Sequence, residues 1–306
     1  MANELKGKDF LRITDLSSDQ LEELLHLAAQ LKGGERSPQD NKILGLLFYK
    51  ASTRTRVSFT VAMYQLGGQV IDLNPNVTQV GRGEPISDTA RVLDRYLDIL
   101  AVRTFKQEDL ETFARYAEIP VINALTDLEH PCQILADFLT VRECLGSLSG
   151  LTLTYLGDGN NVAHSLLLGS AMMGMNVRLG TPPGYEPDPQ VVKEARELAT
   201  GDATIEITED ATAAVRGAQV IYTDVWASMG QESSASDRIP LFQPYQVNAQ
   251  LLKEADDDAI VLHCLPAHRG EEITEEVIEG KQSRVWDQAE NRMHAQQALL
   301  VSLLGI

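Results

Sequence analysis

The chain has 306 residues, of which 43% are hydrophobic and 23% are charged, and both values are ordinary for a folded globular protein. It carries 44 acidic and 26 basic side chains, for a formal net charge of −18, which argues against nucleic acid or an anionic membrane as a partner. An anionic ligand would therefore have to be bound by a local cluster of basic side chains.

Helical and apolar patterns alternate along the first half of the chain. The first helix is predicted to begin at a Ser17 cap, with Gln20 reaching back to it, and to end at Gly33-Gly34. Strands are then expected at 43–49, 70–73, 99–102 and 121–123, separated by helices at 56–66, 88–97 and 108–117. A long amphipathic helix is expected from about residue 130 to 144.

A second alternating series follows a Gly- and Ser-rich segment at 146–150. Its expected strands are 151–156, 177–180, 204–207, 220–223, 260–262 and 285–286, and a final helix is expected at about 290–304. The stretch 228–240 reads as a polar loop. Strand–helix alternation predicts an α/β protein with two doubly wound parallel-sheet domains and a cleft between them. The first domain is predicted to span 1–145, completed by the C-terminal helix 290–306, and the second to span 146–289.

The cysteines and the N-terminal segment indicate the cellular compartment in which the protein works. The three cysteines, Cys132, Cys144 and Cys264, have no C-x-x-C spacing, and an odd count does not indicate a disulfide framework. The first residues contain no apolar segment of a secretory signal, and no apolar run approaches the roughly 18 residues of a membrane span. We therefore expect a reduced, cytoplasmic protein.

The segment Ser52-Thr53-Arg54-Thr55-Arg56 lies where the first expected strand gives way to a helix. Free backbone N–H groups at a helix N-terminus attract anions, and arginine adds a planar, permanently charged fork that fits phosphate oxygens. The segment therefore predicts a phosphate site without a glycine-rich loop. The alternative is an ordinary Ser/Thr cap followed by two solvated arginines.

Arg103 and the pair His130 and Gln133 follow two further strands. Carboxyl ends of parallel strands face the ligand crevice of an open α/β sheet, so Arg103 is a candidate ligand for a phosphate or carbonyl oxygen. His130 and Gln133 are three apart and share one helical face, from which both can donate to such an oxygen. A solvated Arg103 and a capping His130 before Pro131 are the alternatives.

Gly157-Asp158-Gly159-Asn160-Asn161 follows the first strand of the second half. Gly157 and Gly159 half-match the dinucleotide fingerprint, but Val162 replaces its third glycine and the expected later acidic residue is missing. The two asparagines instead place amides at the crevice, where they suit an amino-acid carboxylate. A tight Asn-rich turn is the alternative.

Two more segments follow strands of the second half. Asp224 can pair with a substrate ammonium, and Ser228 and Met229 come soon after it. Cys264 could act as a nucleophile, a metal ligand or a polar contact, or be inert. A metal site is discounted because His263, Cys264 and His268 lack a second cluster at zinc spacing. Nothing in the sequence requires an acyl intermediate on a cysteine.

Taken together, these segments resemble the aspartate/ornithine carbamoyltransferase family. Ser-Thr-Arg-Thr-Arg at 52–56 and His-Pro-Cys-Gln at 130–133 resemble its carbamoyl phosphate signatures. The segments at 158–161, 224–230 and 263–266 resemble its ornithine-using branch. Five motifs in the family's order, over nearly the whole chain, are far more specific than any one of them.

The resemblance implies a role for each matching residue. It implies that carbamoyl phosphate contacts Ser52, Thr53, Arg54, Thr55, Gln79, Arg103, His130, Gln133, Cys264, Leu265 and Arg292. It implies that ornithine contacts Asn161, Asp224, Ser228 and Met229, and that Arg54, Arg103, His130 and Cys264 serve catalysis. Gln79 is implied to act across a subunit interface, in a homotrimer or an assembly of trimers. The implied reaction uses no cofactor and no metal. We expect it to serve arginine biosynthesis, with citrulline breakdown as the alternative direction.

Three alternatives stay open at this point. A related carbamoyltransferase could use aspartate, putrescine or an N-acylated ornithine. A nicotinamide-dependent dehydrogenase would use Gly157 and Gly159, and a non-catalytic binding subunit would use the same pockets without turnover. Comparing rates with these amines, titrating NADH and testing for turnover would discriminate them.

Overall fold

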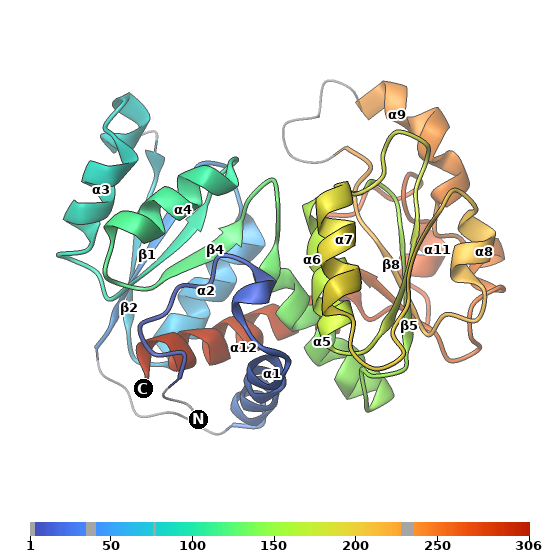
Figure 1. The fold of residues 1–306 in the computed structure, drawn as a ribbon, viewed down its shortest axis with the longest axis horizontal. Coiled ribbons are helices and arrows are strands. Elements are labelled where there is room, and N and C mark those ends of the chain that lie inside the picture. Colours follow the sequence, from blue (N-terminus) through green and yellow to red (C-terminus); the bar gives the residue numbers. More distant parts are fainter. Residues whose placement is uncertain (1–3, 35–40, 76–77, 228–234) are drawn as a thin grey trace. The chain divides into compact units, whose positions relative to one another are not determined.

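The structure is a computed structural model that describes residues 4–34, 41–75, 78–227 and 235–306 (Figure 1). The chain divides into two compact units, Met1–Ala136 with Glu290–Ile306, and Asp137–Ala289. Both divisions fall inside helices, α5 (Pro131–Leu145) and α12 (Val285–Leu304). Within the described ranges, no helix has both the length and the hydropathy needed to cross a membrane.

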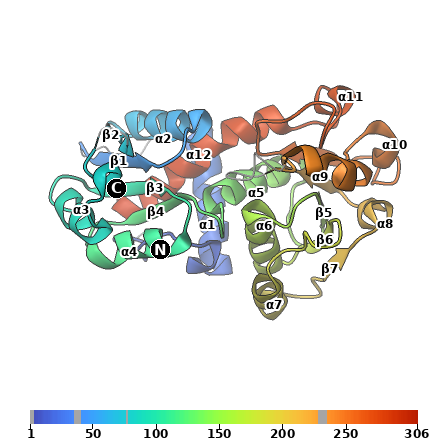
Figure 2. The same cartoon turned by 90° about the horizontal axis from the view of Figure 1, so that it is seen from above.

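The first unit is built on a four-stranded parallel sheet. Its strands run in the order β2 (Gln69–Leu73), β1 (Ile43–Phe48), β3 (Ile99–Arg103) and β4 (Val121–Leu125). Helices α3 (Ile86–Leu93) and α4 (Gln107–Tyr116) pack on one face, over Leu47, Leu100 and Val102. Helix α2 (Thr53–Gln65) and the end of α12 cover the other face (Figures 1 and 2). Helix α1 (Ser18–Lys32) has the predicted reciprocal cap between Ser17 and Gln20.

The second unit is built on a five-stranded parallel sheet. Its order is β7 (Ile205–Thr208), β6 (Asn176–Gly180), β5 (Thr152–Leu156), β8 (Val220–Thr223) and β9 (Ile260–His263). Helices α6 (Asn161–Met172) and α7 (Pro189–Leu198) pair on one face (Figure 1). The short helices α8 (Ala211–Val215), α10 (Ala249–Leu252) and α11 (Glu275–Ile278) pack on the other, with Leu156, Ile221 and Val261 in their core.

The predicted pair of parallel-sheet α/β domains is confirmed, but two local predictions are wrong. Residues 285–286 form no strand, because Val285 already begins α12, about five residues before the expected start. A two-residue apolar run cannot distinguish a strand from the first turn of a helix. Within the predicted loop 228–240, residues from 235 onward form α9 (Ala235–Phe242) despite Pro240 inside it. Burial of Phe242 against Trp226, with ring centroids 5.9 Å apart, favours that helix over the local preference of proline.

The strand order places the candidate site segments. In the first sheet the order reverses between β1 and β3, whose ends Phe48 and Arg103 are paired in register. In the second it reverses between β5 and β8, where Leu156 is paired with Thr223. Ligands of open α/β sheets bind beyond the carboxyl ends of strands at such a reversal. The motif at 52–56 follows β1, and the segments at 157–161 and at 224 follow β5 and β8. Each unit therefore carries one candidate site.

Candidate active site

The N-terminus of α2 is the centre of the site in the first unit. Ser52 precedes the helix with an extended backbone (φ −152°), and its hydroxyl makes no capping hydrogen bond. The first N–H groups of the helix and this hydroxyl can therefore both serve an anion. Thr53 is exposed, Arg54 is partly exposed and Thr55 is buried.

Arg56, the second arginine of the motif, has a structural contact instead. It pairs with Asp72 on β2, and its guanidinium lies over the ring of Phe48, 5.0 Å from the centroid. The two arginines of the motif thus differ, since Arg56 ties α2 to the sheet while Arg54 has no such ion pair among the described residues.

Arg292 of α12 joins two parts of this site. Its Nη2 donates to Oγ1 of Thr55 at 2.7 Å, and its Nη1 donates to Oε1 of Gln133 at 3.0 Å. The Arg292 residue is 4% exposed, so its charge acts in a poorly hydrated environment. The last helix therefore supplies a cation that holds α2 and the start of α5 in a fixed arrangement.

His130 lies between β4 and α5 and is buried. Burial lowers the pKa of His130 well below its ordinary value, and the charges of Arg292 and Arg103 lower it further. The imidazole is therefore neutral at neutral pH and can donate one N–H to an oxygen. The structure thus brings together five predicted residues, Thr55, Arg103, His130, Gln133 and Arg292.

Gln79 is not part of this group of described contacts. It is an exposed residue that precedes the short 3₁₀ helix Val80–Arg82. No hydrogen bond in the described chain joins its side chain to the cluster around Arg292. The role that the resemblance implied for Gln79 needs a second subunit.

A partly buried ion pair immediately before His130 was not predicted from the sequence. Arg12 donates from Nε to Oε1 of Glu129 at 2.7 Å, and the backbone N–H of Ile13 donates to Oε2 at 3.0 Å. Glu129 is fully buried, and its carbonyl accepts from the backbone N–H of Thr126. The N-terminal segment thereby fixes the turn that carries His130. The available signal was an acidic residue directly before a candidate catalytic histidine.

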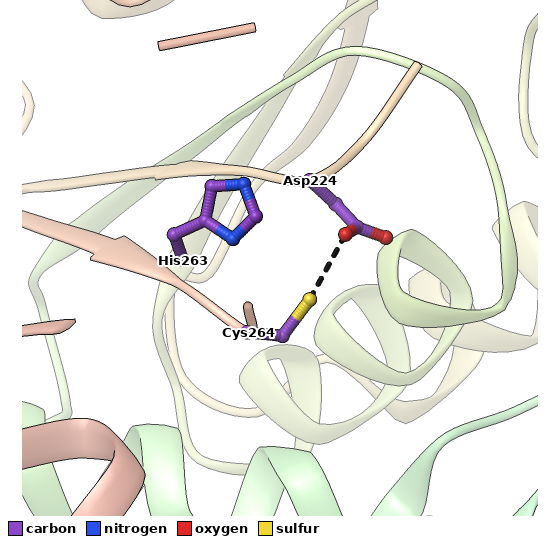
Figure 3. A group of neighbouring side chains, drawn as sticks. All are labelled: Asp224, His263 and Cys264. Atoms are coloured by element: carbon purple, nitrogen blue, oxygen red, sulfur yellow. Dashed lines mark hydrogen bonds between the residues drawn. The ribbon is translucent and has the colours of Figure 1, made fainter. Parts of the chain in front are cut away.

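Asp224 is the centre of the site in the second unit. It follows β8, is 6% exposed, and accepts from Nδ2 of Asn160 at 2.9 Å. It also accepts from the thiol of Cys264 at 3.0 Å, as Figure 3 shows. The Oδ1 of Asn160 caps α6 by accepting from the N–H groups of Val162 and Ala163. Asp224 is therefore a fixed carboxylate that accepts hydrogen bonds from two neutral donors, as a site for an ammonium group requires.

The glycines before α6 have a backbone explanation. Gly157 has φ +140°, which favours glycine. A Cβ on Gly159 would lie 2.2 Å from the backbone nitrogen of Pro187, so no other residue fits without displacing that segment. The half-match to a dinucleotide fingerprint therefore follows from the tight turn that presents Asn160 to Asp224.

His263 organises the segment that follows β9. Its Nδ1 accepts from the N–H of Leu265 at 2.8 Å, and its Nε2 is 2.9 Å from Oε1 of the buried Glu272. This pattern places the ring proton on Nε2 and holds Leu265 with φ +56°, in the left-handed region. One possible metal ligand atom from each of Asp224, His263 and Cys264 lies within 4.8 Å of the others. Because both nitrogens of His263 are already hydrogen bonded, a metal ion would require these contacts to break.

The remaining predicted ligands of the second site are Asn161, Ser228 and Met229. Asn161 is the first residue of α6 and is partly exposed, and the amide that binds Asp224 belongs to its neighbour Asn160. Ser228 and Met229 lie outside the described residues. The structure therefore brings together Asp224 and Cys264, with Leu265 directly after them.

Known proteins with similar sequences cover the whole chain. Residues 8–143 match the sequence model of the carbamoyl-P binding domain of aspartate/ornithine carbamoyltransferase, and residues 149–303 match that of its Asp/Orn binding domain. An ornithine carbamoyltransferase of Nostoc sp. is 70% identical over 301 residues, which are 98% of each protein.

Solved structures show the same relationship. The ornithine carbamoyltransferase of Gloeobacter violaceus is 59% identical, with a TM-score of 0.89 over 97% of this chain and 98% of its own. That of Pyrococcus furiosus is 48% identical, with a TM-score of 0.94 over 98% of both chains. The similarity to these enzymes covers 97–98% of the chain and includes all the candidate site residues. The chain belongs to the aspartate/ornithine carbamoyltransferase family.

Proposed function

We propose that this protein transfers the carbamoyl group of carbamoyl phosphate to the δ-amine of L-ornithine, giving L-citrulline and phosphate, in arginine biosynthesis. The observation that carries the choice of a substrate with a free ammonium group is the Asp224 carboxylate, which is held by Asn160 and Cys264 at the end of β8. It offers one negative charge to the ammonium group of an amino acid. The relatives that match the full chain are named for the same substrate.

The carbamoyl phosphate domain is proposed to comprise residues 1–145, completed by the helix 290–306. Its phosphate would lie at the N-terminus of α2, where Ser52, Thr53, Arg54 and Thr55 supply N–H groups, hydroxyls and a guanidinium. Arg292, which already donates to Thr55 and Gln133, places a second guanidinium beside them. Gln133 would bind the carbamoyl amide.

Arg103 and His130 would stabilise the carbonyl oxygen of the carbamoyl group. The lone pair of the neutral δ-amine forms a bond to the carbonyl carbon, and negative charge develops on that oxygen. The carbonyl then re-forms, the C–O bond to phosphate breaks, and phosphate leaves with the electron pair and takes up the extra proton of the amine. A cation and a neutral imidazole N–H, fixed in advance, stabilise the developing charge without the cost of reorganising water. The reaction needs no covalent enzyme intermediate.

The ornithine domain is proposed to comprise residues 146–289. Asp224 would bind the α-ammonium, and Asn161, Ser228 and Met229 would bind the rest of the α-amino acid group. Cys264 and the main chain of Leu265 would lie at the δ-amine and the carbamoyl group. A free alkyl amine has a pKa of about 10, so the site must select the neutral δ-amine. Because Asp224 would bind the α-ammonium, the δ-amine would contact the uncharged groups of Cys264 and Leu265.

Assembly as a homotrimer, or as a larger group of trimers, completes the proposal. Strand β2 is an edge strand of its sheet, and three apolar side chains on α2 and β2 are well exposed: Val57, Tyr64 and Ile71 at 53%, 58% and 43%. A second subunit on this surface would bury them. Gln79, a few residues after β2, could then reach the site of the neighbouring subunit. We expect the assembly to work in the cytoplasm, where the three cysteines, none of them in a disulfide, stay reduced.

The decisive experiment measures citrulline formation by the purified protein from carbamoyl phosphate and L-ornithine. L-Aspartate, N-acetylornithine and putrescine are tested in parallel. Turnover with ornithine alone is expected. Turnover with another amine would retain the phosphate site of the first unit and reject the substrate assigned to Asp224. Folded protein without turnover on any amine would reject the enzyme.

A further inference from the structure

Two carboxylates lie side by side in the second unit. Asp158 follows β5 and Asp224 follows β8, and these strands are paired in register up to Leu156 and Thr223. Both aspartates are buried, at 8% and 6% exposure, and the charge of Asp224 raises the pKa of Asp158. Two adjacent buried carboxylates repel each other, so at least one of them requires a positive partner.

Arg238 of α9 is the partner of Asp158. Its Nη1 lies 2.8 Å from Oδ2 of Asp158, and both side chains are only 11% exposed. The same nitrogen donates to the carbonyl of Trp226 at 2.8 Å, two residues after Asp224. The guanidinium also lies 4.9 Å from the ring centroid of Tyr185. A charge held by these three groups is fixed in position, in contrast to a solvated surface arginine.

The two carboxylates are therefore in different electrostatic states. Burial raises the pKa of Asp158, and Arg238 lowers it again by a hydrogen bond and by its charge. Asp224 accepts hydrogen bonds from the amide of Asn160 and from the thiol of Cys264. Among the described residues, no lysine or arginine forms an ion pair with Asp224. Asp158 thus has a cationic partner inside the protein, whereas Asp224 accepts from neutral donors.

We propose that Arg238 is a specificity-determining residue for the amine substrate, because its pairing with Asp158 leaves Asp224 as the one carboxylate that can bind the substrate's α-ammonium. The inference rests on the proposed function and assigns Arg238 and Asp158 a part in it. Arg238 acts through Asp158 and through the carbonyl of Trp226, so it is a positioning residue and not a catalytic one. Neither residue emerged as a ligand from the sequence.

The proposal predicts an unequal effect of removing either partner. In Asp158→Asn, the released guanidinium of Arg238 can pair with Asp224 and compete with the substrate ammonium. In Arg238→Gln, the unpaired Asp158 competes with Asp224 for that ammonium. Removing both charges in Asp158→Asn/Arg238→Gln eliminates both competitions. A residue that only supported the fold would instead give losses that accumulate in the double variant.

The experiment is a double-variant cycle with KM for L-ornithine as the readout. We expect KM to rise about 10- to 100-fold in each single variant, the range typical of losing a charged hydrogen-bonded pair. We expect the double variant to recover to within about tenfold of wild type, and Arg238→Lys, which keeps the charge, to lie between wild type and Arg238→Gln. The KM for carbamoyl phosphate should stay within about twofold throughout.

A matched control and a binding assay complete the design. Arg216 and Glu254 form an exposed pair in the same unit, with side chains 69% and 40% exposed, so Arg216→Gln/Glu254→Gln should leave both KM values unchanged. Binding of L-norvaline, which has the α-groups of ornithine but no δ-amine, is measured by calorimetry with carbamoyl phosphate present. Thermal unfolding of each variant shows whether it is folded.

The outcomes separate the two proposals. A double variant as poor as the worse single variant, or equal losses for both substrates, would overturn the role of Arg238. Wild-type protein that binds L-norvaline but forms no citrulline would reject the proposed function. The norvaline affinities of the single and double variants would then still test the role of Arg238. Wild-type protein that neither binds norvaline nor turns over would reject both.

Discussion

Arg292 and Thr55 are joined by a 2.7 Å hydrogen bond from Nη2 to Oγ1 although 237 positions separate them in the chain. The same guanidinium donates to Gln133, so one side chain of the last helix contacts both predicted anion-binding segments of the first unit. Its charge also lowers the pKa of His130. Helix α12 thus contributes a side chain to the site and also packs against the first unit.

Replacing Arg292 with lysine should raise KM for carbamoyl phosphate. Lysine keeps the charge but loses the planar fork that serves Thr55 and Gln133 together, and each charged hydrogen bond contributes about 1.5–3 kcal/mol. We expect a 10- to 100-fold rise, measured by steady-state kinetics, with KM for L-ornithine within about threefold. Arg91→Lys, at an exposed surface pair, is the control. An unchanged KM for carbamoyl phosphate in Arg292→Lys would contradict the role of the fork.

His130 should remain neutral at pH values where an exposed histidine is protonated. Its folded pKa lies well below 6.5, so protons bind the unfolded chain first as the pH falls, and the neutral ring contributes stability that is present above pH 6.5 and is lost below it. We expect the ring resonances of His130 in NMR to show no titration between pH 8 and 6. Arg292→Met removes one of the charges that lower this pKa, so the acid limb of kcat should move to higher pH. A midpoint near 6.5 in the wild-type titration would refute the assignment.

The sequence was sufficient to locate strand-end residues, and insufficient to assign their partners. Ser52, Arg103 and Asp224 could be predicted as ligands because apolar runs define the strands and parallel strands align their carboxyl ends. That Arg56 pairs with Asp72, or Arg238 with Asp158, depends on which helix packs where, and no local pattern carries that information. The same limit explains the helix found where 285–286 was expected to be a strand. Two apolar residues are too few to show a period.

Gly159→Ala should disrupt the ornithine site. The added Cβ would lie 2.2 Å from the backbone nitrogen of Pro187, and a backbone atom cannot move aside by changing rotamer. We expect about 1–3 kcal/mol of lost unfolding free energy and a raised KM for L-ornithine, because the turn presents Asn160 to Asp224. Gly184→Ala meets no atom within 4 Å and tests backbone strain alone, at φ +85°, with an expected cost of about 1–2 kcal/mol. A wild-type KM in Gly159→Ala would show that the turn tolerates displacement.

Cys132 should make the protein sensitive to alkaline pH. Burial raises the pKa of this thiol to about 12, while the unfolded chain ionises near 9.0. Between these values the unfolded state holds fewer protons, so stability is fully present below pH 9 and falls as the pH rises, by up to about 1.4 kcal/mol per pH unit. Cys132→Ser keeps a donor for the carbonyl of Asn123 and does not titrate, so its denaturation midpoint should decline less between pH 9 and 11. Parallel declines of the two proteins would exclude Cys132 as the source.

The pair Arg12 and Glu129 should affect both stability and catalysis. Glu129 is fully buried and Arg12 is 27% exposed, so Arg12→Met removes the guanidinium from a buried carboxylate, while Glu129→Gln leaves a cation that water can reach. We expect Arg12→Met to cost about 2–4 kcal/mol of unfolding free energy and Glu129→Gln about 1 kcal/mol, below the 3–5 kcal/mol of fully buried pairs. Denaturant unfolding at pH 7.5 measures both. Lys42→Met, which breaks the half-exposed pair with Asp98, should cost less than about 1 kcal/mol.

The catalytic effect of the same pair has a separate signature. Glu129 directly precedes His130, and an uncompensated carboxylate there would favour the imidazolium and raise the pKa of His130. In Arg12→Met the acid limb of kcat should therefore move to higher pH, and Arg12→Met/Glu129→Gln should move it back. A pH profile that is the same in all four proteins, alongside the stability losses, would restrict Arg12 and Glu129 to holding the fold. A profile that shifts and then returns would show that the N-terminal segment also sets the charge state of His130.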